Sequence, residues 1–202
     1  MSFQKLGTEI RQEQIARAVL DAIAGGGLRK LSMAAVARQV GLVPSAIYRH
    51  FKNKNEMIEA ALDLIREQAE SKLQEICERI TDPLNRLQAV LVEHVNMSFE
   101  GSVMERILFS EEAFSADFQT LRKVREIIFG YLGRLVDIIQ QGQKDGVIRS
   151  DADPDTLVHV FIGISQSINI LRRITNGEFD AMRHAERSWR IYSEAIMAKD
   201  PA

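Results

Sequence analysis

The sequence predicts an all-α fold of about nine helices. Apolar residues recur at intervals of three and four through most of the 202 residues, which is the spacing of one buried helix face. We find no run in which apolar and polar residues alternate between turns, so no strand is predicted. Only four prolines occur, and Pro83 and Pro154 each follow an aspartate. This pair of residues is typical of a helix start, with Asp as the cap and Pro in the first position.

Four helices are expected in the first third of the chain. The first runs from about Thr8 to Ala24 and ends at the glycines 25–27, which adopt the left-handed backbone of a helix end at little cost. Ser32 can cap a short second helix, and a third is expected from Pro44 to about Phe51. Asn53 can cap a long fourth helix.

The rest of the chain predicts five further helices. Their expected ranges are about 83–100, 102–113, 115–143, 154–174 and 179–198. A chain of helices alone is incompatible with most α/β and all-β enzyme folds.

Composition excludes several classes of protein. The single cysteine, Cys77, rules out a disulfide framework or a thiolate metal cluster and fits a reducing cytosol. No stretch reaches the roughly 18 apolar residues of a membrane span, and the N-terminus lacks the apolar region of a secretory signal. We therefore expect a cytoplasmic protein with no membrane association.

The charge is unevenly distributed along the chain. The formal net charge is −2, but residues 1–54 hold nine Lys and Arg against three Asp and Glu, a net of +6, which leaves −8 on residues 55–202. This asymmetry predicts a basic module at 1–54 joined to an acidic body at 55–202.

The stretch from Leu31 to Lys54 predicts a DNA-binding helix-turn-helix. Two short helices are joined by a turn that contains Gly41, and in this motif the second helix lies in the major groove. Ile47 and Phe51 are four residues apart, so they can anchor the second helix to a small core.

These residues resemble the TetR family of bacterial transcriptional regulators. The resemblance is carried by the helix that Ser32 begins, the turn at 40–42, the Ile-Tyr-Arg-His-Phe segment at 47–51 and Lys54. It implies that Tyr48, Lys54 and Ser32 contact DNA phosphates, with Ser32 also capping its helix.

The remaining candidates for DNA contact surround the second helix. Pro44 and Ser45 begin it, where free amides favour a phosphate or a base edge, and small apolar side chains can meet a thymine methyl group. Arg49 and His50 are further candidates, although the family histidine often packs inward. The predicted DNA-binding residues are Ser32, Val43, Pro44, Ser45, Ala46, Tyr48, Arg49, His50 and Lys54.

The last two helices predict a homodimer interface, by resemblance to the family's four-helix bundle. Helix 154–174 is apolar around most of its circumference, and helix 179–198 carries an apolar seam. An intrachain core is the alternative interpretation. A twofold dimer is also expected because this motif normally reads two half-sites. The predicted interface residues are Phe161, Ile164, Ile168, Leu171, Trp189, Tyr192 and Ile196.

The central helices imply, again by resemblance, a pocket for a small and largely hydrophobic effector. Most of their Phe and Met residues can equally be ordinary core. The candidate pocket residues are His94, Met97, Met104, Phe109, Phe114, Phe118 and Phe129.

The sequence therefore predicts a homodimeric repressor that a small ligand releases from a palindromic double-stranded DNA operator. The alternatives are an activator or architectural DNA-binding factor without a ligand, and an adaptor whose acidic body binds proteins. We expect no enzyme, cofactor or metal, because no catalytic motif is present and the four histidines show no ligand spacing.

Overall fold

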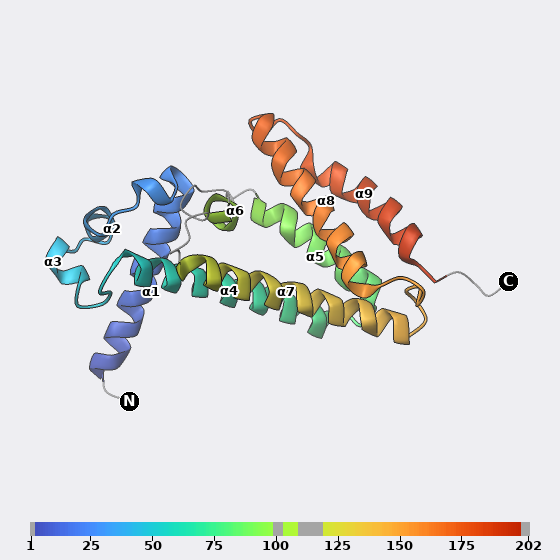
Figure 1. The fold of residues 1–202 in the computed structure, drawn as a ribbon, viewed down its shortest axis with the longest axis horizontal. Helices are drawn as coiled ribbons and strands as arrows, with labels where there is room; N and C mark the ends of the chain where they lie inside the picture. Colours follow the sequence, from blue (N-terminus) through green and yellow to red (C-terminus); the bar gives the residue numbers. More distant parts are fainter. Residues whose placement is uncertain (1–2, 99–102, 109–118, 199–202) are drawn as a thin grey trace. The chain divides into compact units, whose positions relative to one another are not determined.

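A computed structural model describes residues 3–98, 103–108 and 119–198, and it confirms the all-α prediction for them (Figure 1). A short 3-10 helix, η1 (Leu28–Lys30), separates the first two α-helices. The α-helices are α1 (Phe3–Gly26), α2 (Met33–Gln39), α3 (Pro44–Ile47), α4 (Lys54–Arg79), α5 (Pro83–Ser98), α6 (Val103–Leu108), α7 (Gln119–Lys144), α8 (Pro154–Ile174) and α9 (Ala181–Ile196).

Several helices differ from their expected bounds. The first begins at Phe3 instead of Thr8. α3 ends at Ile47, and hydrogen-bonded turns, not regular helix, continue to Phe51. α6 is described as far as Leu108, and the predicted residues 109–113 and 115–118 lie outside the described part of the chain.

Helix starts follow the capping rules that the sequence suggested. Before Pro83, the Asp82 carboxylate accepts the Asn85 N–H at 2.7 Å. Before Pro154, the Asp153 carboxylate accepts both the N–H and the hydroxyl of Thr156. These bonds stabilise the charged carboxylate and lower the pKa of Asp153.

The described residues form two compact units, each with its own apolar core. The first unit takes residues 1–70 and 101–128, and the second takes 71–100 and 129–202. This division does not follow the expected boundary at residue 54. The reason is that α4 continues the core of the first module, and that Ile107, Val124 and Ile127 return to the same core from later in the sequence.

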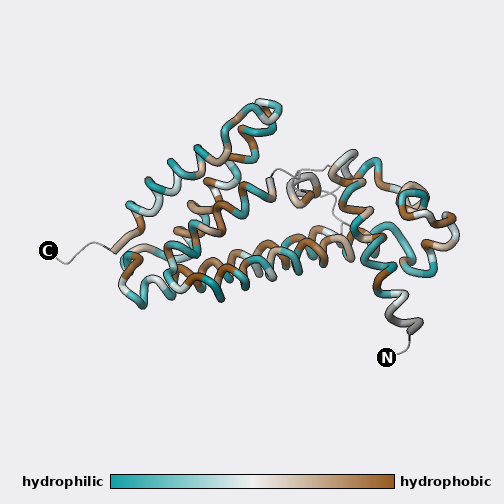
Figure 2. The backbone as a smooth tube through the Cα atoms, turned by 180° about the vertical axis from the view of Figure 1, so that it is seen from behind, coloured by the Kyte–Doolittle hydropathy of each residue, from teal (hydrophilic) through white to brown (hydrophobic). Residues whose placement is uncertain are grey.

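The second unit is built around α5, the later part of α7, α8 and α9. Figure 1 shows α8 and α9 side by side as an antiparallel pair, and both contact α5. Apolar and polar positions alternate along the long helices in Figure 2, as expected of helices with one buried face.

The core of the second unit contradicts the predicted interface role of five of the seven dimer residues. It buries Phe161, Ile168, Trp189, Tyr192 and Ile196 within the single chain. Their spacing marks the inward faces of α8 and α9, because a helix packed on its own subunit shows the same periodicity as one packed on a partner. Ile164 and Leu171 are half-buried and remain available to a partner.

The outward faces of α8 and α9 carry other large apolar side chains. Val160, Ile170 and Ile174 on α8 and Ile191 on α9 are all more than half exposed. Val160, Ile164, Ser167, Leu171 and Ile174 follow one another at intervals of three and four, so they form one stripe along α8, which we call the α8 stripe.

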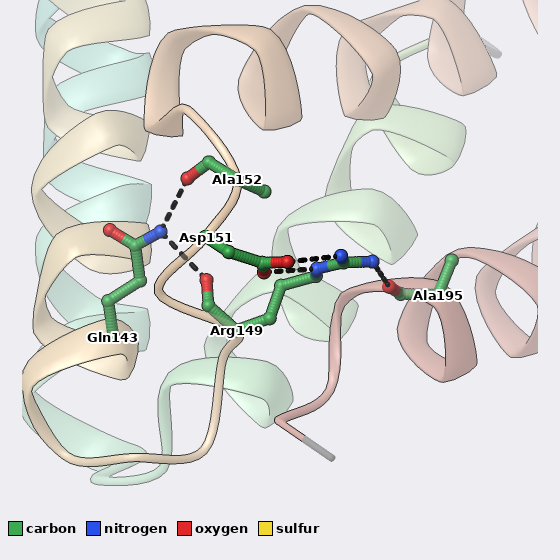
Figure 3. A network of polar contacts seen from close by, with 5 residues as sticks. All are labelled: Gln143, Arg149, Asp151, Ala152 and Ala195. Atoms are coloured by element: carbon green, nitrogen blue, oxygen red, sulfur yellow. Dashed lines mark hydrogen bonds and ion pairs between the residues drawn. The ribbon is translucent and has the colours of Figure 1, made fainter.

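A polar network ties the loop between α7 and α8 to the end of α9 (Figure 3). The Gln143 amide donates to the carbonyl oxygens of Arg149 and Ala152 at 2.9 and 2.8 Å. The Arg149 guanidinium donates to Asp151, and this carboxylate raises the pKa of Arg149. The Arg149 N–H also donates to the Ile196 carbonyl, beside an antiparallel bridge between Ile148 and Met197.

We predict that Gly142→Ala in α7 destabilises the second unit. A Cβ atom at Gly142 would lie 2.5 Å from Cδ1 of the buried Ile148 and 3.1 Å from Cβ of Pro83. Such overpacking costs about 1–3 kcal/mol, measurable as a lower midpoint of denaturant unfolding.

The matched control for this prediction is Gly133→Ala in the same helix. A Cβ atom there would meet no other atom within 4 Å, so the helix propensity of Ala should stabilise the protein by up to about 1 kcal/mol. Equal unfolding midpoints for the two variants would contradict the prediction.

Candidate DNA-binding surface

Local hydrogen bonds cap both ends of α2, the first helix of the helix-turn-helix. Ser32 caps the helix as predicted, because its Oγ accepts the Ala35 N–H at 3.2 Å. At the other end Gly41 has a φ of 70°, and the N–H of Leu42 donates to the Ala37 carbonyl at 2.8 Å. This is a Schellman ending, in which glycine accepts the left-handed backbone that turns the chain toward α3.

The predicted anchors of the recognition helix are buried in the first unit. Ile47 has no exposed surface, and Phe51 keeps only 6%. They pack in the same core as Val36 and Ala37 of α2. Burial of Ile47 in α3 and of Phe51 in the turn that follows it fixes which face of this short helix points outward.

The outward face of α3 carries apolar side chains that the subunit does not use. Val43 is 64% exposed and Tyr48 is 58% exposed. Pro44, Ser45 and Arg49 are also exposed, whereas Ala46 is half-buried. A valine and a tyrosine exposed beside an arginine suit a DNA groove, where methyl groups, phosphates and base edges meet.

His50 is turned partly away from this face. The side chain is half-buried, and its Nδ1 atom is buried with no hydrogen-bond partner. The Gln12 amide of α1 donates to the backbone carbonyl of His50 at 3.2 Å. The structure therefore favours a packing role for His50 over base reading.

Lys54 is held in place by a carbonyl group that the sequence did not reveal. Its Nζ donates to the Leu28 carbonyl oxygen of η1 at 2.8 Å. An ammonium group has three N–H donors, so this bond leaves two that can reach a phosphate. Asn53 and Glu56 support the position, since Asn53 Oδ1 accepts the Glu56 N–H at 2.9 Å and Glu56 accepts the Lys52 N–H.

The candidate pocket residues that the structure describes are divided between the two units. Met104 belongs to the first unit, whereas His94, Met97 and Phe129 belong to the second. Met97 and Phe129 are exposed. The other three candidates, Phe109, Phe114 and Phe118, lie outside the described residues.

His94 has partners that the sequence analysis did not name. Its Nδ1 lies 2.9 Å from Ser165 Oγ, and its Nε2 lies 2.8 Å from the Tyr131 hydroxyl. Burial lowers the pKa of His94 to about 4 and raises that of Tyr131. The sequence held one indication of a buried polar partner, since Ser165 falls between Phe161 and Ile168 on the inward face of α8.

None of the helices that the structure describes is long and apolar enough to cross a membrane. Among the same residues, no group of three or more His, Cys, Asp or Glu side chains could hold a metal ion.

Residues 15–61 match the family model described as bacterial regulatory proteins of the tetR family. Two relatives extend the similarity beyond this module. The nucleoid occlusion factor SlmA of Marinobacter nauticus is 28% identical over 197 residues, covering 92% of this chain and 95% of that protein. The transcriptional repressor KstR2 of Mycolicibacterium smegmatis is 26% identical over 159 residues, covering 75% and 74% of the two chains.

Solved structures show a similar fold. The transcriptional regulator FadR of Bacillus subtilis, solved in complex with stearoyl-CoA, superposes with a TM-score of 0.77 at 20% identity. The match covers 91% of this chain and 98% of that chain.

We predict that Tyr48→Phe weakens binding to duplex DNA by about tenfold or more, the value of one hydrogen bond to a charged phosphate. The exposed side chain should leave the unfolding midpoint unchanged. Fluorescence anisotropy of a labelled duplex measures the binding.

Tyr192→Phe serves as the matched control, since that hydroxyl donates to the Leu157 carbonyl inside the second unit. It should lower stability and leave DNA affinity intact. The reverse pattern in the two variants would remove Tyr48 from the DNA contacts.

Proposed function

Because the chain belongs to the TetR family of bacterial regulatory proteins, we propose that it is a homodimeric transcriptional repressor. It binds a palindromic operator in the cytoplasm, and a small, largely hydrophobic effector releases it. The observation that carries the proposal is the outward face of α3, with Val43, Ser45 and Tyr48 exposed over a buried Ile47. The excess positive charge of residues 1–54 supports it, since Lys and Arg supply the attraction to phosphates.

The other residues proposed to contact DNA keep their assignments, with two refinements from the structure. Ser32, Pro44 and Arg49 are exposed, and Ala46 is half-buried beside them. Lys54 reaches a phosphate while one of its N–H groups remains on the Leu28 carbonyl. His50 stabilises the helix by packing, since its Nδ1 atom is buried.

The homodimer uses the α8 stripe and Ile191 in this proposal. Val160 is 53% exposed and Ile174 is 69% exposed, so the stripe offers apolar surface that the single chain leaves uncovered. Burying such surface against a second copy is favourable, and a twofold axis matches a palindromic operator.

Coupling between effector and DNA is supported by the shared core of the first unit. Ile107 of α6 and Val124 and Ile127 of α7 are buried together with the core residues of α1 and α3. An ion pair of 2.7 Å between Asp63 of α4 and Lys123 of α7 adds a polar link within this unit. Movement of α6 or α7 can therefore be transmitted to the DNA-binding helices through side chains that pack in one core. The change in DNA affinity that an effector can cause is limited by the difference between its affinities for the DNA-binding and the non-binding conformation.

The effector class is suggested by two regulators of similar fold. One was solved with stearoyl-CoA, and another is described as the ketosteroid regulator KstR2 of Mycobacterium tuberculosis. Both names point to molecules with a large apolar part, in keeping with the expected hydrophobic effector.

A second candidate function rests on the SlmA relative, which matches nearly the full length of both chains. In this alternative the protein acts on the chromosome as a DNA-binding factor that no small molecule releases. The two functions differ in where the protein binds and in what removes it.

Sequencing the chromosomal DNA that is crosslinked to the protein in cells tests the proposal. A repressor should occupy a few palindromic promoter sites, and deleting the protein should raise transcription beside them. Stearoyl-CoA as the first probe should lower operator affinity in anisotropy. Many sites spread over the chromosome, with affinity unchanged by any effector that binds the body, would favour the second candidate. Lower transcription after deletion would indicate an activator.

With the identified operator, Lys54→Ala should lower the slope of log affinity against log salt concentration by about one. Loss of the bond to Leu28 should also cost about 1 kcal/mol of stability. Lys144→Ala, in the exposed last turn of α7, is the control and should leave both quantities unchanged. An unchanged slope for Lys54→Ala would restrict Lys54 to a structural role.

We further predict that Val160→Glu combined with Ile174→Glu converts the dimer to a folded monomer. Charges on two exposed positions should leave the subunit intact but oppose association. Light scattering after gel filtration gives the mass, and circular dichroism confirms the fold. Ile10→Glu, at an exposed apolar position of α1, should remain dimeric. A dimer that survives the double substitution would place the interface elsewhere.

A further inference from the structure

Three polar side chains meet inside the second unit, and we call them the His94 triad. His94 comes from α5, Tyr131 from α7 and Ser165 from α8. The imidazole lies between the two hydroxyl groups, at 2.9 Å from Ser165 and 2.8 Å from Tyr131. The Phe161 ring, centred 6.1 Å from the imidazole, belongs to the surrounding apolar core.

Counting protons shows that the triad has one more donor than it uses internally. A neutral imidazole donates from one nitrogen and accepts at the other, and each hydroxyl has one proton. When Nδ1 donates to Ser165, Tyr131 donates to Nε2 and the Ser165 proton is left over. When Nε2 donates to Tyr131, Ser165 donates to Nδ1 and the Tyr131 proton is left over. In both tautomers one hydroxyl proton points outside the triad.

The charge around the triad determines which kind of group can accept a hydrogen bond from its spare hydroxyl proton. Burial keeps His94 neutral near pH 7, with its pKa lowered to about 4. Burial raises the pKa of Tyr131, and the negative charge of Glu93 raises it further. A carboxylate brought to the triad would meet this negative charge and no cation of the triad, and it would lose its hydration. A carbonyl oxygen needs one donor and carries no net charge.

The triad is not fully enclosed by protein. Ser165 is buried, but His94 and Tyr131 are only half-buried. The proposed site requires another molecule to approach the triad along the exposed part of His94 and Tyr131.

We propose that the His94 triad is the polar anchor of the effector site and donates a hydrogen bond to an uncharged carbonyl oxygen of a mainly apolar molecule. A ketone, ester or thioester carbonyl has this chemistry, whereas a free carboxylate does not. The inference rests on the proposed function in one respect, namely that a small molecule controls the protein.

The test compares three probes of equal chain length, 2-tridecanone, tridecane and tridecanoate. Calorimetry gives their affinities for the full chain. The infrared stretch of a 13C-labelled carbonyl group reports whether the ketone is hydrogen-bonded. We expect the ketone to bind about tenfold more tightly than the alkane, which corresponds to one hydrogen bond, and more tightly than the carboxylate. Its carbonyl band should shift to lower frequency on binding.

The variant that tests the residues is Tyr131→Phe combined with Ser165→Ala. It should abolish the preference for ketone over alkane and reduce the shift of the carbonyl band. The control makes the same two changes elsewhere in the unit, as Tyr192→Phe with Ser193→Ala. Those hydroxyls donate to the Leu157 and Arg190 carbonyls, outside the triad and outside the α8 stripe. The control should keep the preference, even at reduced stability.

Several outcomes would overturn the inference. Equal binding of ketone and alkane, tighter binding of the carboxylate, an unchanged preference in the triad variant, or no binding of any probe would each do so. DNA binding is measured on the same samples. Protein that binds its operator but not the ketone refutes the triad alone, and protein that binds no DNA refutes the proposed function.

Discussion

The apolar core of the first unit is the constraint on which the rest depends. It buries Ile47 and Phe51, and this burial sets the direction in which α3 presents Val43 and Tyr48. A helix of four residues has little stability of its own, so its orientation comes from those two contacts and from the Schellman ending at Gly41. The surface proposed to read DNA is thus a consequence of what the core removes from water.

The same core is assembled from two separate stretches of chain. Ile107, Val124 and Ile127 follow the DNA-binding motif by many residues, yet they pack with α1 and α4. A protein whose DNA-binding core includes side chains from its central helices need not transmit a signal through a flexible linker. Close packing makes such a core respond to small displacements, because filled interiors do not deform continuously.

In the second unit, polar groups are placed in a few well-defined positions within an otherwise apolar interior. Tyr192 satisfies its hydroxyl on the Leu157 carbonyl, whereas the His94 triad satisfies all but one of its protons internally. Around them α8 and α9 bury one face within the subunit and leave the α8 stripe outside. These two helices can therefore serve the subunit core and an interface at the same time.

The sequence alone determined the helical class, the helix-turn-helix and its capping residues, because these depend on contacts within a few positions along the chain. Ser32, Gly41 and Ile47 take the roles that their local spacing predicts. Tertiary structure decided everything that depends on which residues of distant segments meet. It moved Phe161 and Trp189 from the expected interface into the core, because periodicity marks a buried face without identifying what covers it. It also gave Lys54 the Leu28 carbonyl and His94 its two hydroxyl partners, since a hydrogen bond across 26, 37 or 71 residues leaves no pattern in a single sequence.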